Sequence, residues 1–382
     1  MKKDLKVKKV NKIDMEIVKK VNKIDMEIVK IVNKIDMEIV NKIDMEIVKK
    51  VNKIDMEIVK KVNKIDMEIV KNKNGEKEIE YVKPFLKWVG GKTQILEQIL
   101  NKMPCSMENY HEIFLGGGSV LLGLLTLQKE GLIEVKKKIY AYDFNKPLIY
   151  VYKNIQKTPK KFLNTIIKII NEYYSIKGEV INRKPTKKEE SLTSQESYFY
   201  WIRSKYNEMT DDEKISLLGS SYFVFLNKTC FRGVFRVGPN GFNVPFGHYN
   251  NPGIIDKSHI KKVSELIKDV EFIHASFEDS LKNAKKGDMV YEDPPYYKLD
   301  KNSFVDYTAD GFNQETHDKL FKMLHELKKQ NINWMMSNSS ADYVIKCFDD
   351  KKKYSIEKIS CRRAINSKNP ESKVNEVIIK SY

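Results

Sequence analysis

The segment at residues 289–299, MVYEDPPYYKL, places an acidic residue, two prolines and two tyrosines directly after a short apolar run. Proline stiffens the backbone and tyrosine presents a planar aromatic face. A planar base stacked on Tyr296 could donate its exocyclic amino hydrogens to the Asp293 carboxylate and the Pro294 carbonyl. This pair of acceptors favours a tetrahedral nitrogen whose lone pair attacks an electrophile, and positioning then supplies much of the acceleration.

The electrophile that fits such a nucleophile is a sulfonium methyl group, whose positive charge is stabilised beside an aromatic face such as that of Trp88. In duplex DNA an exocyclic amine becomes accessible only when its base is rotated out of the stack. A purely structural interpretation is the alternative, in which two prolines end a strand and the tyrosine is half buried. Two glycine-rich segments earlier in the chain favour the chemical interpretation.

The first of these segments, PFLKWVGGKTQILEQIL at residues 84–100, contains a Gly-Gly-Lys turn that opens a run of helical periodicity. Backbone amides at such a turn and helix start are able to hold an anionic group, and Lys92 adds positive charge. The spacing of a Walker loop is absent. The segment therefore predicts an anion-binding turn of another kind.

The second segment, NYHEIFLGGGSVLLGLL at residues 109–125, has the pattern of a strand, a glycine loop and a helix. A further strand at residues 136–145 carries Asp143 near its end, which is placed to bind ribose hydroxyls. The order is typical of an α/β sheet that binds a nucleotide-like ligand at the carboxyl edge of its strands. The three glycines predict a close approach of that ligand to the backbone, and a plain tight turn is the alternative.

Three motifs, FLKWVGGK at 85–92, FLGGGS at 114–119 and DPPY at 293–296, resemble in this order the Dam-type, or D12 class, DNA adenine-N6 methyltransferases. The resemblance runs from about Pro84 to the C-terminus, where residues 362–382 resemble the closing hairpin of these enzymes. It implies an α/β fold with a Rossmann-like methyltransferase sheet and an inserted, mostly helical target-recognition domain that carries a β-hairpin. It also implies S-adenosyl-L-methionine as the methyl donor, no metal, and an activity of the kind found in restriction-modification systems.

The resemblance assigns roles to particular residues of this chain. The target adenine would be bound by the catalytic residues Asp293, Pro294, Pro295 and Tyr296. The cofactor would be bound by Trp88, Gly90, Gly91, Lys92, Phe114, Gly116, Gly117, Gly118, Ser119, Asp143 and Asp293.

Residues 225–253 interleave aromatic and basic side chains, and the GPNG sequence within them predicts a hairpin turn. A half-buried hairpin with ordinary surface charges is the alternative. In the family that the chain resembles, this segment is the target-recognition hairpin, which makes Arg236 the candidate guanine reader and Phe231 or Arg232 the candidates for intercalation or phosphate contact. The expected DNA-binding residues are Lys87, Lys228, Phe231, Arg232, Arg236 and Asn240.

Arg232 departs from the pattern of the family that the chain resembles, because many members that read GATC have an asparagine at this position. We expect GATC as the first candidate target and another short palindrome that contains adenine, such as CATG, as the second. Asp293 favours adenine over cytosine-N4 methylation, since the cytosine enzymes more often resemble SPPY. Methylation of RNA or of protein glutamine, more often associated with NPPY, fits less well, and an inactive DNA-binding relative is the alternative from a different class.

The N-terminal segment, residues 1–74, contains six copies of NKIDMEIV that follow one another at steps of 11 residues, except for one step of 8. An 11-residue repeat corresponds to about 3.67 residues per turn and predicts a long helix with one apolar stripe. A strand or disorder are the alternatives. Such an arm would serve self-association or tethering, if it has a function at all. Beyond a linker, we expect the catalytic domain at 75–145 and 265–382 and the recognition domain at 146–264.

The composition sets outer bounds on the function. The 382 residues carry a formal net charge of +17, which favours a polyanionic partner, here double-stranded DNA, although a lysine-rich surface without a specific partner would look the same. No apolar run approaches the roughly 20 residues that cross a bilayer. The four cysteines show no CxxC spacing, which argues against a structural zinc site and fits a reducing, cytoplasmic compartment, or that of a host cell if the chain is viral.

Overall fold

The computed structural model describes residues 79–297, 312–362 and 373–382. The contacts divide the chain into Met1–Ile79 and Glu80–Tyr382, and the described residues lie almost entirely in the second unit. The predicted helix of NKIDMEIV repeats and most of the predicted linker lie outside the described residues.

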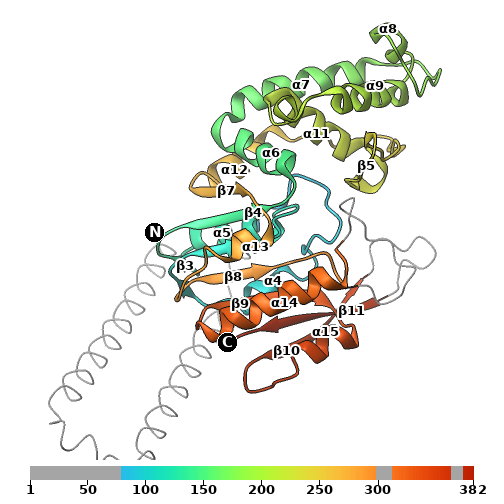
Figure 1. The fold of residues 1–382 in the computed structure, drawn as a ribbon. Helices are drawn as coiled ribbons and strands as arrows, with labels where there is room; N and C mark the ends of the chain where they lie inside the picture. Colours follow the sequence, from blue (N-terminus) through green and yellow to red (C-terminus); the bar gives the residue numbers. More distant parts are fainter. Residues whose placement is uncertain (1–78, 298–311, 363–372) are drawn as a thin grey trace, which may run out of the picture. The chain divides into compact units, whose positions relative to one another are not determined.

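The central element is a mixed sheet of seven strands in the order β10-β11-β9-β8-β2-β4-β7 within the described residues (Figure 1). In that order the strands are Ser355–Arg362, Lys373–Lys380, Asn333–Ser339, Met289–Glu292, Tyr110–Glu112, Ile139–Asp143 and Val270–His274. The five strands from β9 to β7 run parallel, whereas β10 and β11 are antiparallel to their neighbours. The predicted α/β class with a mostly parallel sheet is confirmed.

The parallel register brings distant segments to one edge of the sheet. Glu112 of β2 pairs with Ala141 of β4 and with Tyr291 of β8, so the carboxyl ends of these strands lie side by side. The residues that follow β2 and β8, together with Asp143 at the end of β4, therefore meet at this edge. The three strands are largely buried, as expected for parallel strands covered on both faces.

The described residues form helices, of which some cover the sheet and others form a separate helical segment. They are α4 Leu96–Leu100, α5 Ser119–Lys129, α6 Lys146–Lys157, α7 Pro159–Ser175, α8 Lys188–Ser191, α9 Gln195–Glu208, α10 Asp211–Lys214, α11 Leu217–Thr229, α12 Lys257–Leu266, α13 Phe277–Leu281, α14 Gln314–Lys329 and α15 Asp342–Cys347. Figure 1 shows α13 and α14 on the near face of the sheet. There Leu281, Leu320 and Leu324 pack against Trp334 and Val377 in one buried core. Among the described residues no helix is both long and apolar enough to span a bilayer.

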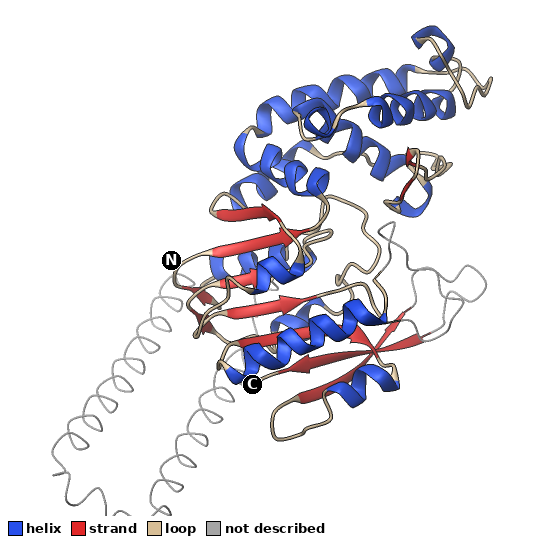
Figure 2. Ribbon diagram, viewed as in Figure 1, coloured by secondary structure: helices blue, strands red, loops and turns tan. Residues whose placement is uncertain are grey.

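A mostly helical segment, α6 to α11, lies between β4 and β7 in the chain and gathers beyond β7 in Figure 2. Its helices α7, α9 and α11 pack on one another through aromatic rings, since Phe225 contacts Tyr173 and Tyr198 edge to face. Two short antiparallel strands follow, β5 Val237–Gly238 and β6 Gly241–Phe242. Two further short strands, β1 Ser106–Met107 and β3 Glu134–Val135, pair in parallel.

Asn227, near the end of α11, connects this helical segment by hydrogen bonds to the backbone of Lys87, which precedes the sheet in the chain. Its buried side chain accepts a hydrogen bond from the Lys87 amide at 3.0 Å and donates to the Lys87 carbonyl at 2.7 Å. It also donates to the Gly233 carbonyl at 3.1 Å. One amide thereby satisfies three backbone groups of two segments far apart in the sequence.

We predict that Asn227→Leu lowers the free energy of unfolding of the described unit by roughly 2–4 kcal/mol, because it leaves partly buried backbone groups without partners. Chemical denaturation of the full chain followed by far-UV circular dichroism measures this. Asn164→Leu is the control, because Asn164 is exposed on α7. Equal stability of the two variants would contradict the role given to Asn227.

Candidate active site

Asp293 follows the last residue of β8 and faces a lysine from the N-terminal motif. The Lys92 ammonium nitrogen lies 2.6 Å and 2.7 Å from the two carboxylate oxygens of Asp293 and 2.6 Å from the Gly90 carbonyl oxygen. Lys92 is 4% exposed. The sequence predicted that Lys92 would add charge for an anionic ligand, but the structure directs its ammonium group to Asp293, because a lysine this buried requires a carboxylate partner.

Three neighbouring carboxyl groups, those of Asp293, Glu112 and Glu292, differ in pKa because their surroundings differ. Burial raises the pKa of Asp293 to about 6, while the Lys92 ammonium opposes that rise, so Asp293 is ionised at neutral pH. Burial raises the pKa of Glu112 to about 8, although its side chain accepts a 2.8 Å hydrogen bond from the Tyr110 hydroxyl. Burial, and then Asp293, raise the pKa of Glu292, whose oxygens have no hydrogen-bond partner among the described residues. Of these three residues, Asp293 is therefore the one whose carboxyl group carries a negative charge at neutral pH.

The Tyr296 ring stands beside this ion pair. The Lys92 ammonium nitrogen lies 4.8 Å from the ring centroid, and the Tyr296 hydroxyl donates a 2.7 Å hydrogen bond to Glu376 of β11. The next residue is held as well, since the Tyr297 amide donates to Asn338 at 3.1 Å and the Tyr297 carbonyl accepts from the Ser339 hydroxyl at 2.7 Å. The segment after β8 is thus fixed by β9 and β11.

α14 fixes the same segment from its other side. Nε2 of His317 lies 3.1 Å from the Pro295 carbonyl oxygen, and its Nδ1 lies 2.9 Å from the Asn313 carbonyl oxygen. Burial lowers the pKa of His317, and the contacts with the Asn313 and Pro295 carbonyls oppose this fall.

The glycine loop between β2 and α5 is organised by its neighbours. The Gly116 amide donates to the Asp143 carboxylate at 2.9 Å. Gly116 and Gly118 have positive φ angles of 50° and 69°. A methyl group at Gly116 would lie 2.8 Å from the Trp88 ring, and one at Gly118 would lie 2.6 Å from the Tyr152 hydroxyl oxygen. The backbone angles and the contacts with Trp88 and Tyr152 therefore require glycine at these two positions, whether or not a ligand approaches the loop.

Asp143 is oriented by two backbone donors. Besides the Gly116 amide, the Asn145 amide donates to its second oxygen at 2.8 Å. Burial raises the pKa of Asp143, and both amide donors oppose this rise. Beside it Phe144 is 66% exposed, an unusual position for a large apolar ring, and its centroid lies 6.1 Å from that of His274. Sequence reasoning missed Phe144.

The two glycine segments face each other across a pocket of about 380 Å³. Its lining residues are Lys83, Pro84, Leu86, Trp88, Gly91, Thr93, Gln94, Gly117 and Ser119. The Lys92 amide donates to the Ser119 hydroxyl at 3.0 Å and joins the two segments. The helix predicted to open at Gly-Gly-Lys is α4, which begins only at Leu96 and has no side-chain cap, so the turn does not form a helix start for an anion.

Predicted DNA-binding residues gather around Tyr249. The Lys87 ammonium nitrogen lies 3.7 Å from the Tyr249 ring centroid and donates to the Lys228 carbonyl at 3.4 Å. The Tyr249 hydroxyl accepts a 2.9 Å hydrogen bond from the Arg232 amide, and Arg232 has a φ of 56°. Burial and the neighbouring Lys87 charge lower the pKa of Lys228 to about 8. Lys87 and Lys228 therefore form one basic cluster, which Arg232 joins through its backbone amide.

The remaining predicted DNA-binding residues lie further along the same segment. Phe231 is 48% exposed, and the Arg232 guanidinium carbon lies 5.1 Å from its ring centroid. Nε of Arg236 donates a 2.7 Å hydrogen bond to Asn243. Asn240 is exposed in the turn between β5 and β6.

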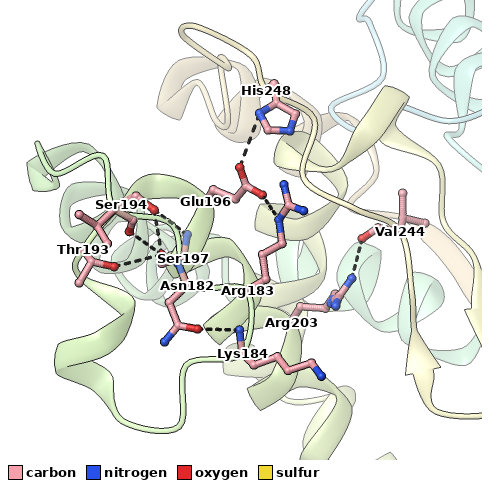
Figure 3. Close-up of polar contacts among 11 residues, drawn as sticks. Asn182, Arg183, Lys184, Thr193, Ser194, Glu196, Ser197, Arg203, Val244 and His248 are labelled. Atoms are coloured by element: carbon pink, nitrogen blue, oxygen red, sulfur yellow. Dashed lines mark hydrogen bonds and ion pairs between the residues drawn. The ribbon is translucent and has the colours of Figure 1, made fainter.

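A buried glutamate on α9, Glu196, lies beside Arg183 and His248, and His248 precedes Tyr249 in the chain (Figure 3). Glu196 accepts a 2.7 Å hydrogen bond from Nε of Arg183 and lies 3.7 Å from Nδ1 of His248. His248 has a φ of 52°. Sequence reasoning missed Glu196 and Tyr249, because nothing in the local pattern separates them from other charged or aromatic residues of the helical segment.

Comparison with known proteins bears on this arrangement. A profile of the D12 class N6 adenine-specific DNA methyltransferases matches residues 88–365. The Type II methyltransferase M.MjaIII of Methanocaldococcus jannaschii is 35% identical over 312 residues, which cover 79% of this chain and 99% of that protein. The Type II methyltransferase M1.LlaDCHI of Lactococcus lactis subsp. cremoris is 29% identical over 79% of this chain and 96% of its own length.

A third relative, the Retron Ec67 DNA adenine methylase of Escherichia coli, is 28% identical over 77% of this chain and 89% of its own length. The matched region contains the Asp293–Lys92 pair, the glycine loop and the basic cluster, except that Lys87 lies just before the start of the profile. The chain belongs to the D12 class N6 adenine-specific DNA methyltransferases.

Proposed function

We propose that the chain transfers a methyl group from S-adenosyl-L-methionine to N6 of an adenine that is rotated out of duplex DNA at a short palindromic site, with GATC as the first candidate and CATG as the second. The observation that carries this proposal is the ionised Asp293 beside the Tyr296 ring, held by the buried Lys92. A hydrogen-bond acceptor and an aromatic face thus meet at the carboxyl edge of the sheet.

Asp293 and the Pro294 carbonyl would accept the two hydrogens of the adenine amino group while the base stacks on Tyr296. Both hydrogen bonds favour the tetrahedral nitrogen and so bind the transition state better than the ground state. Pro295 fixes the turn that presents these groups. The role of Lys92 is to keep Asp293 ionised, because a protonated carboxyl group would offer a weaker acceptor.

S-adenosylmethionine supplies the electrophilic methyl group when it is bound. The residues proposed to hold it are Trp88, Gly90, Gly91, Lys92, Phe114, Gly116, Gly117, Gly118, Ser119 and Asp143. Of these, Trp88, Gly91, Gly117 and Ser119 line the pocket between the two glycine segments, which supports their part of the assignment. Asp143, oriented by two amides, is suited to ribose hydroxyls. The exposed Phe144 ring is suited to stack on the adenine of the cofactor.

The helical segment and its hairpin, residues 146–264, would form the target-recognition domain, and residues 75–145 and 265–382 the catalytic domain. Lys87 and Lys228 repel each other, and a DNA phosphate between them would relieve this repulsion. Arg236 uses Nε in its bond to Asn243, so that bond does not involve the two terminal nitrogens that form the fork suited to guanine. Phe231, Arg232 and Asn240 would contact the same duplex.

The test is a panel of short duplexes that contain GATC, CATG or neither, incubated with the full chain and tritiated S-adenosylmethionine. Digestion and mass spectrometry of the products identify the modified base. N6-methyladenine confined to one of the palindromes supports the proposal. N4-methylcytosine, or methylation of all duplexes alike, contradicts it.

We predict that Asp293→Ala abolishes methyl transfer and leaves duplex binding within about threefold, because it removes an interaction made in the transition state. Single-turnover methylation and fluorescence anisotropy measure the two effects. Asp212→Ala, at an exposed residue of α10, is the control and should behave as the unmodified chain. Methyl transfer by Asp293→Ala at the rate of the unmodified chain would contradict the catalytic role assigned to Asp293.

A second prediction concerns pH. Because Asp293 must be ionised and its pKa is about 6, kcat/KM should be constant near pH 8 and fall about tenfold per unit below pH 6. Lys92→Gln removes the charge that lowers the pKa of Asp293, so the fall of kcat/KM on the acid side should begin at a higher pH. Lys319→Gln removes an ion pair with Glu278 and should leave the pH dependence of kcat/KM unchanged. If kcat/KM of Lys92→Gln fell over the same pH range as that of the unmodified chain, the Lys92–Asp293 ion pair would not be what sets this pH dependence.

A third prediction concerns Arg236. We expect Arg236→Ala to cost about 1–3 kcal/mol of discrimination at one guanine of the target, since a bidentate contact would be lost. Competition between duplexes with a single base-pair change measures this cost. Lys168→Ala, which removes an exposed positive charge on α7 of the same helical segment, is the control. A uniform loss of affinity across all duplexes would instead identify Arg236 as a phosphate contact.

A further inference from the structure

Glu376 lies on β11, far in the sequence from the catalytic segment, yet it holds the only polar atom of the Tyr296 side chain. The Tyr296 hydroxyl donates to its carboxylate at 2.7 Å. Glu376 pairs in register with Ser339 of β9, and its neighbour Val377 is buried in the core between β9 and the helices. The carboxylate is therefore carried by a strand inside the sheet, which is a rigid support.

The bond acts where the ring has most freedom. Tyr296 follows two prolines that fix the backbone, so the orientation of its ring depends on two side-chain torsions. A hydrogen bond at the far end of the ring fixes the position of the hydroxyl oxygen and so restrains the first torsion, which places the ring; the second torsion is restrained only because the hydroxyl hydrogen prefers the ring plane. Burial and the nearby Asp293 and Glu376 carboxylates raise the pKa of Tyr296, which keeps the hydroxyl protonated as the donor.

We infer that Glu376 is a positioning residue, which acts through the Tyr296 hydroxyl to fix the aromatic face on which the target base stacks. This inference rests on the proposed function. It makes β11 part of the substrate-binding apparatus, with Glu376 acting through the Tyr296 hydroxyl. A merely structural bond between β11 and the catalytic segment would stabilise the fold without changing the reaction of folded enzyme.

Four variants of the full chain separate these two roles. Glu376→Ala removes the acceptor, Tyr296→Phe removes only the donor, and the double variant removes both. Glu376→Gln keeps an acceptor oxygen. Glu357→Ala is the matched control, because Glu357 is an exposed glutamate on the neighbouring strand β10.

The measurements are kcat, KM, the thermal midpoint, and the fluorescence of 2-aminopurine placed at the target adenine, which reports stacking of the rotated base. We expect Glu376→Ala and Tyr296→Phe each to lower kcat by roughly tenfold or more, as for loss of a hydrogen bond to a charged group. The double variant should be no slower than the slower single variant. Glu376→Gln should recover most of the rate, and both single losses should alter the 2-aminopurine signal.

Two results would overturn the inference. One is a kcat within twofold of the unmodified chain in both single variants, with a lowered thermal midpoint as the only change in Glu376→Ala. The other is a double variant whose loss equals the product of the single losses, because independent effects multiply. Failure of the proposed function would look different, since the unmodified chain itself would then neither methylate DNA nor change the 2-aminopurine signal.

Discussion

Lys92 and Asp293 form an ion pair where water is largely excluded, and the chemistry of the site depends on it. Removing one partner of such a pair leaves an uncompensated charge, which costs more than the pair itself contributes. Glu112 and Glu292 lie nearby without a cation of their own, and burial raises the pKa of both. One lysine therefore decides which carboxyl group stays ionised at neutral pH.

The rest of the fold keeps that pair and the Tyr296 ring in place. The parallel strands bring the loops after β2 and β8 together, and the Lys92 amide ties its turn to Ser119 at the start of α5. Asn227 ties the backbone of Lys87 to the end of α11. The same few hydrogen bonds thus connect α11, the two glycine segments and Asp293.

Sequence alone predicted the elements whose signals are local. The short apolar run before Asp293 forms β8, and Asp143, predicted near the end of a strand, is the last residue of β4. It did not predict contacts between distant residues: Lys92 and Asp293 are 201 positions apart, and Tyr296 and Glu376 are 80 apart. A pattern of neighbours contains no information on such pairs. The glycines of the loop were predicted as a place where a ligand approaches the backbone, which stays a prediction; the sequence did not show that Trp88 and Tyr152 occupy the space that a side chain at Gly116 or Gly118 would need.

The central claim is that this chain methylates adenine N6 within one short DNA sequence. The most direct measurement is single-molecule sequencing of plasmid DNA from a methylation-free host that expresses the full chain, with N6-methyladenine and N4-methylcytosine scored at every site. The account predicts N6-methyladenine on both strands of one palindrome and no N4-methylcytosine. Modified cytosine, or unmodified DNA in cells that contain the folded protein, would contradict it.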